Sequence, residues 1–433
     1  MRVTRRGAVR RRSRARGWTA TASLTTQAHA APAPAAPADA RLDVLFLTTA
    51  TLPPLGADTW VSVQLMRELD RDDHTVHLAC ATGPEGDPTP TFLAVRGVRG
   101  LHVLPVDLGP ELAGEPSLKG RLGALWATVP ALGSLVRLAR YIRRNDIRVI
   151  HSTDRPRDAF ACTLLARITR ARSIVHVHVG YAEWMSGLRR RSIRSADALI
   201  AISQFVKHTL AASGHPGRTT HVVLNAIDLD RWEPDVGRDE ARAELGIPDG
   251  APVVVTVCRL FEAKGPEQLI RAIAIVRDEL PDVRLVIVGD DGPEQGRYTS
   301  HLAEVAAGLG LTDQVLFLGR RNDVPRLMAA ADVFAMPSFD EPFGLVYLEA
   351  MAMERPVVAL TNGGTPEVVV DGVTGLLSEP GDMEALAGNL VRLLRDPSLR
   401  KQMGGHGRRR VEEHFTADRM AADAAQVYRL VAS

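Results

Sequence analysis

Short apolar runs alternate along most of the chain with longer stretches in which apolar residues recur at helical spacing. The run at 42–48 (LDVLFLT) is almost continuously apolar, as expected for a parallel strand that is covered on both faces. In the stretch that follows, Trp60, Val63 and Met66 recur every three residues, which predicts an amphipathic helix. Further strands of the first half are predicted at 75–80, 101–106, 147–152, 173–179, 198–203 and 221–225.

This alternation stops after residue 225 and resumes at residue 252. The segment between is rich in Pro, Gly and Asp, which is typical of a linker with a short helix. Strands that alternate with helices predict an α/β fold with two Rossmann-like, doubly wound domains, at 41–228 and 229–410. The two domains would face a central cleft, in which ligands bind at the carboxyl ends of the strands. The second series of strands is predicted at 252–260, 283–289, 314–319, 332–337 and 356–360.

The first 40 residues differ from the rest, because a basic run is followed there by an Ala-Pro tract. One interpretation is a signal peptide that is cleaved after Ala28-His29-Ala30. The stretch before that site contains one leucine and many threonines, which is too polar for the apolar part of a signal peptide. We therefore expect a disordered basic extension, or a start codon that was assigned too far upstream.

Composition favours a globular protein of two domains, since the chain has 433 residues, of which 45% are hydrophobic and 24% charged. The net charge of +2 predicts no general attraction to nucleic acid. No apolar run reaches the roughly 18 to 20 residues that span a bilayer. Cys80, Cys162 and Cys258 lack the spacing of metal ligands and indicate buried thiols in a reducing compartment, so we expect a cytoplasmic protein.

Gly56 lies between the first predicted strand and the first predicted helix. A glycine there lets the backbone approach a phosphate beside the free N–H groups of a helix N-terminus, although a simple tight turn would also explain it. The segment does not have the G-x-G-x-x-G pattern of dinucleotide enzymes, so a nicotinamide cofactor is not expected.

Two cations lie close together in the second half of the chain. Arg259 ends a predicted strand, and Lys264 stands just before the Gly265-Pro266 entry to a helix. Fixed cations beside a helix N-terminus can bind a diphosphate, and an arginine can do so through two hydrogen bonds. The alternative for Lys264 is a solvated loop lysine.

Glu341 and Glu349 are separated by seven residues that include a Pro-Phe-Gly turn. Pro342 and Gly344 exclude a helix that runs on from Glu341, so Glu341 belongs to a loop and a helix begins near Gly344. The free amides of residues 343–345 would then face an anion or a hydroxylated ligand. Glu349 would lie on the second turn, where the helix dipole alone is a sufficient explanation for a carboxylate.

The segment SIVHVHVG carries two histidines on the same face of a predicted strand. His178 would be nearer the cleft than His176, while His151 ends the preceding predicted strand. The H-x-H pair suggests a metal site, but no third ligand has a spacing that supports one, so no metal is predicted. Histidines at such positions can also be core residues.

Taken in order, these motifs resemble the retaining glycosyltransferases of family 4, which have the GT-B architecture of two Rossmann-like domains. The segments CRLFEAKG, RLVIVGDDGPE and SFDEPFGLVYLEAMA carry the resemblance, which runs over about 130 residues of the second half. It extends more loosely to LGADTWVSVQLMREL, ADALIAISQFV and VLNAIDLDRW in the first half. The E-x7-E motif of Glu341 and Glu349 is its most specific part.

The resemblance implies a UDP- or GDP-linked sugar as donor, bound mainly by the second domain, with no cofactor and no metal. Its two catalytic residues would be Glu341, at the hydroxyls of the donor sugar, and His178, near the reacting carbon. Glu349 would accept hydrogen bonds from the ribose, and Arg259 and Lys264 would hold the diphosphate. The donor-binding residues are thus Gly56, Arg259, Lys264, Phe343, Gly344, Leu345 and Glu349.

The chain departs from the family pattern at four places. Leu55-Gly56 replaces a glycine pair, Asn225-Ala226 replaces Asn-Gly, and Asp290-Asp291 contains an additional aspartate. Val179 stands where the family's histidine would directly precede glycine, so the register of the catalytic histidine is open by one or two positions.

The acceptor would be a lipid, a glycan or a small molecule bound by the first domain. The helix that carries Arg189, Arg190, Arg191 and Arg194 is either a solvated basic face or a peripheral contact with an anionic membrane on its cytoplasmic side. The family resemblance also implies that a C-terminal helix in 411–433 returns to the first domain, with Met420, Ala424, Val427 and Leu430 along one side. A sugar-nucleotide-binding protein of the same fold, without catalysis, is the alternative function.

Overall fold

The computed structural model describes residues 41–50, 56–81, 88–109, 118–181, 185, 187–215, 219–234, 236–292 and 296–433, with side chains from residue 131 in the helix that begins at 118. The predictions for residues 1–40 and for Leu55 lie outside this part of the chain.

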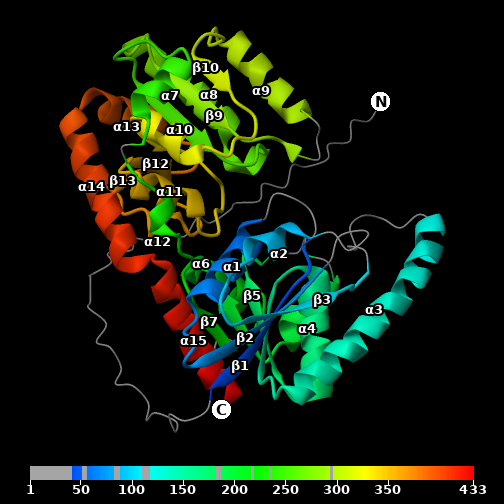
Figure 1. The fold of residues 1–433 in the computed structure, drawn as a ribbon. Coiled ribbons are helices and arrows are strands. Elements are labelled where there is room, and N and C mark those ends of the chain that lie inside the picture. The colour runs from blue at the N-terminus through cyan, green and yellow to red at the C-terminus, as the bar shows by residue number, and fades with distance from the viewer. Residues whose placement is uncertain are drawn as a thin grey trace, which may run out of the picture. The chain divides into compact units, whose positions relative to one another are not determined.

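A seven-stranded parallel sheet organises the first half of the chain, in the order β3-β2-β1-β4-β5-β6-β7 (Figure 1). The strand order reverses between β1 and β4, and loops that leave the carboxyl ends of such a pair diverge to opposite faces. The strands are β1 Leu42–Thr48, β2 His74–Ala81, β3 Leu101–Val106, β4 Val149–Thr153, β5 Arg172–Val177, β6 Ala198–Ala201 and β7 Thr220–Val222. All seven predicted strands are confirmed, with small shifts at their ends.

A second parallel sheet of six strands follows, in the order β10-β9-β8-β11-β12-β13, and its order reverses between β8 and β11. Five of these strands were predicted, whereas β13 was not, because its four residues include a glycine and directly follow a turn. Its pairing with β12 defines it as a strand. The strands are β8 Val253–Val257, β9 Arg284–Val288, β10 Val315–Phe317, β11 Val333–Ala335, β12 Val357–Leu360 and β13 Gly375–Ser378.

Helices connect the strands in both halves, which confirms the predicted α/β fold with two doubly wound domains. In the first half they are α1 Ala57–Glu68, α2 Pro90–Ala94, α3 Leu118–Arg144, α4 Pro156–Thr169, α5 Gly187–Ser195 and α6 Gln204–Ala212. In the second half they are α7 Arg238–Glu244, α8 Pro266–Glu279, α9 Arg297–Gly308, α10 Val324–Ala330, α11 Leu345–Ala352, α12 Thr365–Val368, α13 Met383–Arg395 and α14 Pro397–His414. The last helix is α15 Ala417–Ala432, and single 3-10 turns lie at Leu229–Arg231 and Glu262–Lys264.

Strand β1 shows why the apolar runs are nearly continuous. Val44 and Phe46 pack into a core with α1 and α15, whereas Leu45 and Leu47 pack into a separate core with α3 and α4. Because successive side chains of a strand point to opposite faces, a sheet covered on both sides needs apolar residues at every position. No described helix is long and apolar enough to span a membrane.

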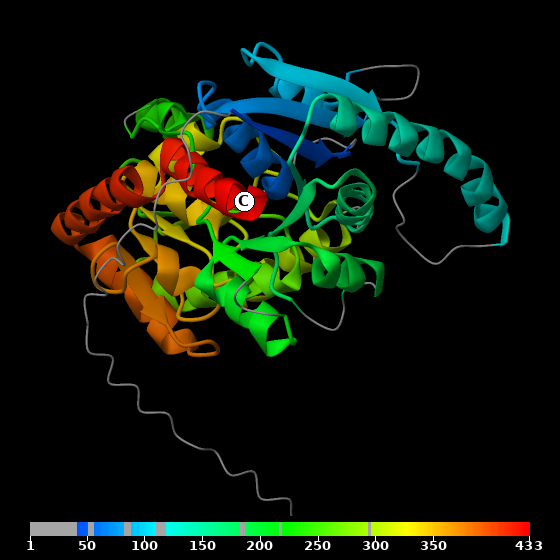
Figure 2. The ribbon, with the colours of Figure 1, turned by 90° about the horizontal axis from the view of Figure 1, so that it is seen from below.

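The C-terminal helix α15 packs against α1, and both helices share a core with the strands of the first sheet, as Figure 2 shows for the two helices. Met420 and Ala424 are buried there, and the hydroxyl of Tyr428 lies 2.7 Å from Nδ1 of His151. The predicted boundary near residue 410 falls inside α14, which continues to His414. Leu430, expected on the apolar side, is 60% exposed.

We predict that Met420→Ala destabilises the protein by about 2–5 kcal/mol, since it leaves a cavity between α15 and the first sheet. Leu430→Ala, on the exposed side of the same helix, should change stability by no more than about 0.5 kcal/mol. Urea denaturation followed by circular dichroism measures both. Equal effects of the two substitutions would contradict the packing of α15.

Candidate active site

Lys264 and Glu341 form an ion pair at the point where the order of the second sheet reverses. Lys264 lies in the turn after β8, and Glu341 lies in the loop after the neighbouring strand β11. The Lys264 Nζ donates to Oε2 of Glu341 at 2.6 Å, and the two side chains are 21% and 7% exposed. The two residues that were predicted to meet the diphosphate and the sugar are therefore in direct contact.

Arg259 lies two residues after β8, and its exposed side chain reaches across the ring of Phe261. The guanidinium carbon is 5.2 Å from the centre of this ring, and the Lys264 ammonium is 5.8 Å from the same centre. Contact with an aromatic face favours a cation by about 0.5–1 kcal/mol at an exposed site. Phe261 therefore contacts both of the cations that were predicted to hold the diphosphate.

Helix α11 begins at Leu345, as predicted, and Gly344 is its N-cap. Gly344 has φ 89°, and a Cβ there would overlap the ring of Tyr347, so only glycine fits. Phe343 is almost fully buried against Phe415, with ring centres 5.9 Å apart, so its side chain anchors the loop. The first amides of an α-helix lack i−4 partners within the helix. Those of α11 begin at Leu345, four positions after Glu341.

Glu349 lies on the second turn of α11 and is partly buried. Burial raises the pKa of Glu349 to about 7, while the positive charge of Arg231 acts in the opposite direction. Arg231 belongs to the 3-10 turn at the start of the linker, and its guanidinium carbon is 5.1 Å from the ring centre of Trp60 on α1. Glu349 therefore changes its charge near neutral pH, which the sequence alone did not indicate.

In the first domain, Gly56 and His178 follow strands β1 and β5. Gly56 is the N-cap of α1, and a Cβ there would overlap the carboxylate of Asp58. Asp58 accepts a hydrogen bond from Arg155 Nε at 2.7 Å. A side chain at position 56 would therefore have to displace the Asp58 carboxylate of this ion pair, which lies where the order of the first sheet reverses.

His178 is partly buried among two ion pairs, Asp58–Arg155 and Asp154–Arg189. Burial lowers the pKa of His178, while the charges of Asp154 and Asp58 act to raise it. The ring is therefore predominantly neutral at pH 7. Of these four partners, sequence analysis named only Arg189, as part of a basic helix. Asp154 and Arg155 lie within three residues of the end of a predicted strand, which is a signal that could have identified them.

His151 and His176 are core residues below His178. The ring centres of His151 and His176 are 5.3 Å apart, and those of His176 and His178 are 4.3 Å apart. Burial lowers the pKa of His151 to about 3 and that of His176 well below its ordinary value. Within the described residues no group of three His, Cys, Asp or Glu side chains is arranged to hold a metal ion.

The additional aspartate of the Asp290-Asp291 pair has a local structural role. Asp291 accepts hydrogen bonds from the amides of Gly296, Tyr298 and Thr299, at 2.8, 2.8 and 3.2 Å. These amides lie at the N-terminus of α9. Asp291 therefore accepts hydrogen bonds from N–H groups that have no acceptor within the helix.

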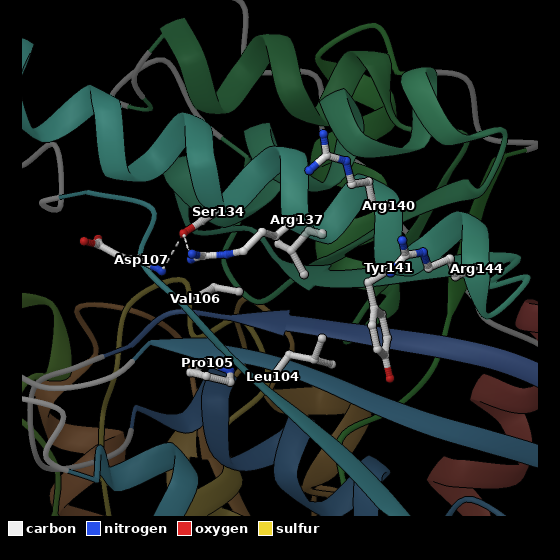
Figure 3. A pocket seen from close by; sticks show the side chains of 10 residues that line it. Leu104, Pro105, Val106, Asp107, Ser134, Arg137, Arg140, Tyr141 and Arg144 are labelled. Carbon is white, nitrogen blue, oxygen red and sulfur yellow. Dashed lines mark hydrogen bonds between the residues drawn. The ribbon is translucent and has the colours of Figure 1, made fainter.

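A cavity of about 640 Å³ lies between β3 and α3, away from the predicted residues (Figure 3). Its walls include three arginines of α3, Arg137, Arg140 and Arg144, and the apolar residues Leu104 and Val106 of β3. A smaller cavity of about 290 Å³ lies beside the junction of α14 and α15. Neither cavity is lined by a predicted site residue, so the candidate site is defined by side-chain geometry.

Comparison with known proteins adds family relationships to this geometry. Residues 237–410 match the model of glycosyl transferases group 1, and residues 59–231 match that of glycosyltransferase family 4. A GDP-mannose-dependent monoacylated alpha-(1-6)-phosphatidylinositol monomannoside mannosyltransferase of Corynebacterium glutamicum is 37% identical over 244 residues, which are 52% of this chain and 61% of that protein. An alpha-maltose-1-phosphate synthase of Mycolicibacterium smegmatis is 35% identical over 265 residues, or 57% of this chain and 67% of that protein.

Among solved structures, that of Anabaena HepE in complex with UDP and glucose is similar, with a TM-score of 0.73 and 23% identity. The similarity covers 90% of this chain and all of HepE. At this level of identity it shows the shared GT-B fold of two Rossmann-like domains.

We predict that the stability of the protein falls between about pH 5 and pH 7 through Glu349. The folded state keeps its proton up to about pH 7, whereas the unfolded chain releases it near pH 4.5, so the folded state binds more protons in this window. The free energy of unfolding should decrease by about 1–3 kcal/mol as the pH rises, and Glu349→Gln should remove this decrease. Urea denaturation at several pH values measures it.

The matched control is Glu304→Gln, at an exposed position of α9. It should retain the pH dependence of the unsubstituted protein. A Glu349→Gln variant with the same pH dependence as Glu304→Gln would contradict the raised pKa of Glu349.

Proposed function

The chain belongs to the group 1 and family 4 glycosyltransferases, and from this we propose that it transfers a sugar from a nucleoside diphosphate to an acceptor with retention of the anomeric configuration. The observation that carries the proposal is the Lys264–Glu341 pair beside Arg259 and the N-terminus of α11. This arrangement combines cations for a diphosphate with a carboxylate for sugar hydroxyls.

Charge development in the reaction explains the roles of these residues. As the bond between sugar and phosphate breaks, negative charge builds on the leaving diphosphate and positive charge builds on the sugar. Lys264 and Arg259 stabilise the diphosphate, and the ammonium of Lys264 has three N–H donors, so it can keep its bond to Glu341. With these cations in place, we propose that the reaction proceeds without a metal ion.

Glu341 would accept hydrogen bonds from hydroxyls of the donor sugar, and the amides of Phe343, Gly344 and Leu345 would support the same ligand. His178 would face the reacting carbon from the first domain as a neutral ring. The acceptor would attack on the face that the diphosphate leaves, guided by that phosphate. This route retains configuration without a covalent intermediate.

The donor would be a UDP- or GDP-sugar, with its ribose on Glu349. The Corynebacterium relative is described as GDP-mannose-dependent, and HepE was solved with UDP. Glu349 would bind the ribose that UDP and GDP share, so the proposal includes both nucleotides.

The acceptor would be a lipid, a glycan or a small molecule, bound by the first domain. The name of the Corynebacterium relative specifies a phosphatidylinositol mannoside acceptor, which supports a lipid. On α5, Arg191 and Arg194 are exposed, whereas Arg189 is engaged by Asp154. A peripheral contact with an anionic membrane would therefore use Arg191 and Arg194 without Arg189.

We predict that incubation with a panel of UDP- and GDP-sugars releases free nucleoside diphosphate. Lys264→Ala and Glu341→Ala should each lower this turnover by about 100-fold, the usual loss when one preorganised charge is removed. Lys401→Ala, at an exposed position of α14, is the control and should retain full turnover. A chelator should leave the rate unchanged.

Wild-type rates in Lys264→Ala or Glu341→Ala would mean that the roles are misassigned. Donor binding in calorimetry without any turnover would instead identify a sugar-nucleotide-binding protein. Neither binding nor turnover with any donor would contradict the proposed function.

We also predict that donor affinity rises by about tenfold from pH 6 to pH 8. Ribose hydroxyls donate to an ionised carboxylate, and the fraction of ionised Glu349 increases over this range because its pKa lies at about 7. Calorimetric titration with the UDP- or GDP-sugar that the panel identifies as the donor measures the affinity at each pH. In Glu349→Gln the affinity should be low and independent of pH, and a persistent rise would exclude Glu349 as its source.

A further inference from the structure

Helix α6 of the first domain has its N-terminus capped by the second domain. The amide of Gln204 donates to Oε2 of Glu367 at 2.7 Å, and the amide of Phe205 donates to Oε1 of the same carboxylate at 2.7 Å. The hydroxyl of Ser203 donates to the carbonyl of Pro342 at 2.7 Å. Pro342 directly follows Glu341, so α6 is bonded to the loop of the candidate active site.

These contacts satisfy the first three amides of the helix. An α-helix leaves its initial N–H groups without internal partners, and a carboxylate at this end also interacts favourably with the helix dipole. Each carboxylate oxygen of Glu367 accepts a hydrogen bond from one of the first two amides. The amide of Val206, the third, donates to the hydroxyl of Ser203 at 3.1 Å. Ser203 is completely buried. Separation of the domains would therefore leave two amides and one carboxylate without these partners.

The backbone of Glu367 is itself held in the second domain. Its carbonyl accepts from a guanidinium nitrogen of Arg410 on α14 at 2.8 Å. Helix α12, which carries Glu367, begins directly after Gly363-Gly364, and the amide of Gly364 donates to the carbonyl of Glu341 at 2.7 Å. A Cβ on Gly364 would overlap the carbonyl of Pro342, so this close packing depends on glycine. Glu367 is thus fixed to the Glu341 loop.

The body of α6 contacts the segment that carries His178. The amide of Tyr181 donates to the hydroxyl of Thr209 at 3.0 Å. The ring of Phe205 lies 3.5 Å from the position that a Cβ on Gly180 would occupy. Helix α6 is therefore bonded on one side to the His178 segment and on the other to the Glu341 loop.

We propose that Glu367 and Ser203 are positioning residues, which set His178 relative to Glu341 by capping α6 across the domain boundary. Neither residue needs to touch the donor for this role. The consequence for catalysis rests on the proposed function, whereas the effect on the arrangement of the domains does not.

The experiment compares Glu367→Ala with the unsubstituted full-length chain. All of the proposed donor-binding residues except Gly56 belong to the second domain, so the donor dissociation constant from calorimetry should change by less than about twofold, while kcat falls by about tenfold or more. A residue that only stabilises the fold would not separate kcat from donor affinity in this way. Small-angle X-ray scattering of the donor-bound chain should show a larger radius of gyration in the variant.

Two further variants keep the test decisive if Glu367→Ala does not fold. Glu367→Gln keeps the side-chain size but replaces one accepting oxygen with a donor, and Ser203→Ala removes the bond to Pro342. Both should show the same separation of kcat from affinity, to a smaller extent. Glu304→Gln, on α9, is the matched control and should behave like the unsubstituted chain.

Unchanged kcat and unchanged scattering in the Glu367 and Ser203 variants would overturn the proposal and leave the proposed function intact. An equal loss of kcat and donor affinity would also overturn it, because it would place Glu367 in donor binding. If the unsubstituted chain turns over no donor, the proposed function fails, and scattering by itself decides whether Glu367 holds the two domains together.

Discussion

The burial of the Glu341 carboxylate is the constraint on which the candidate site depends. A carboxylate that is only 7% exposed is costly unless a cation and hydrogen bonds compensate for the loss of water. Lys264 supplies the cation, because β8 and β11 are adjacent and the loops after them begin at the same edge of the sheet. The close packing of Gly364 against the backbone of Glu341 and Pro342 then restrains the loop that carries this carboxylate.

The two sheets have the same topological feature at the position of their charged residues. In each sheet the strand order reverses once, between β1 and β4 and between β8 and β11, and charged side chains gather at both positions. The first sheet presents Asp58 and Arg155, and the second presents Lys264 and Glu341. Parallel sheets of this kind bind ligands where loops diverge at such a reversal, so the two charged clusters are where the fold favours a ligand.

The electrostatics of the two sides differ in a way that suits the proposed reaction. On the first-domain side, burial keeps the His178 ring predominantly neutral. Each of the two ion pairs around the ring contains one positive and one negative side chain. On the second-domain side, Arg259 and Lys264 both contact the ring of Phe261. A leaving diphosphate would therefore meet positive charge on one side, while the sugar faces a neutral ring on the other.

The sequence by itself determined the local structure, because strand and helix periodicity, turn residues and caps depend on neighbours along the chain. Among the residues that the structure describes, it placed twelve of the thirteen strands and located the start of α11 near Gly344, but it missed β13, which only its pairing with β12 defines. Tertiary structure decided which distant residues meet. Lys264 and Glu341 are 77 positions apart, and the raised pKa of Glu349 results from burial that periodicity does not reveal. The sequence analysis did not select Glu367, and only the approach of α6 from the other domain makes its carboxylate a cap.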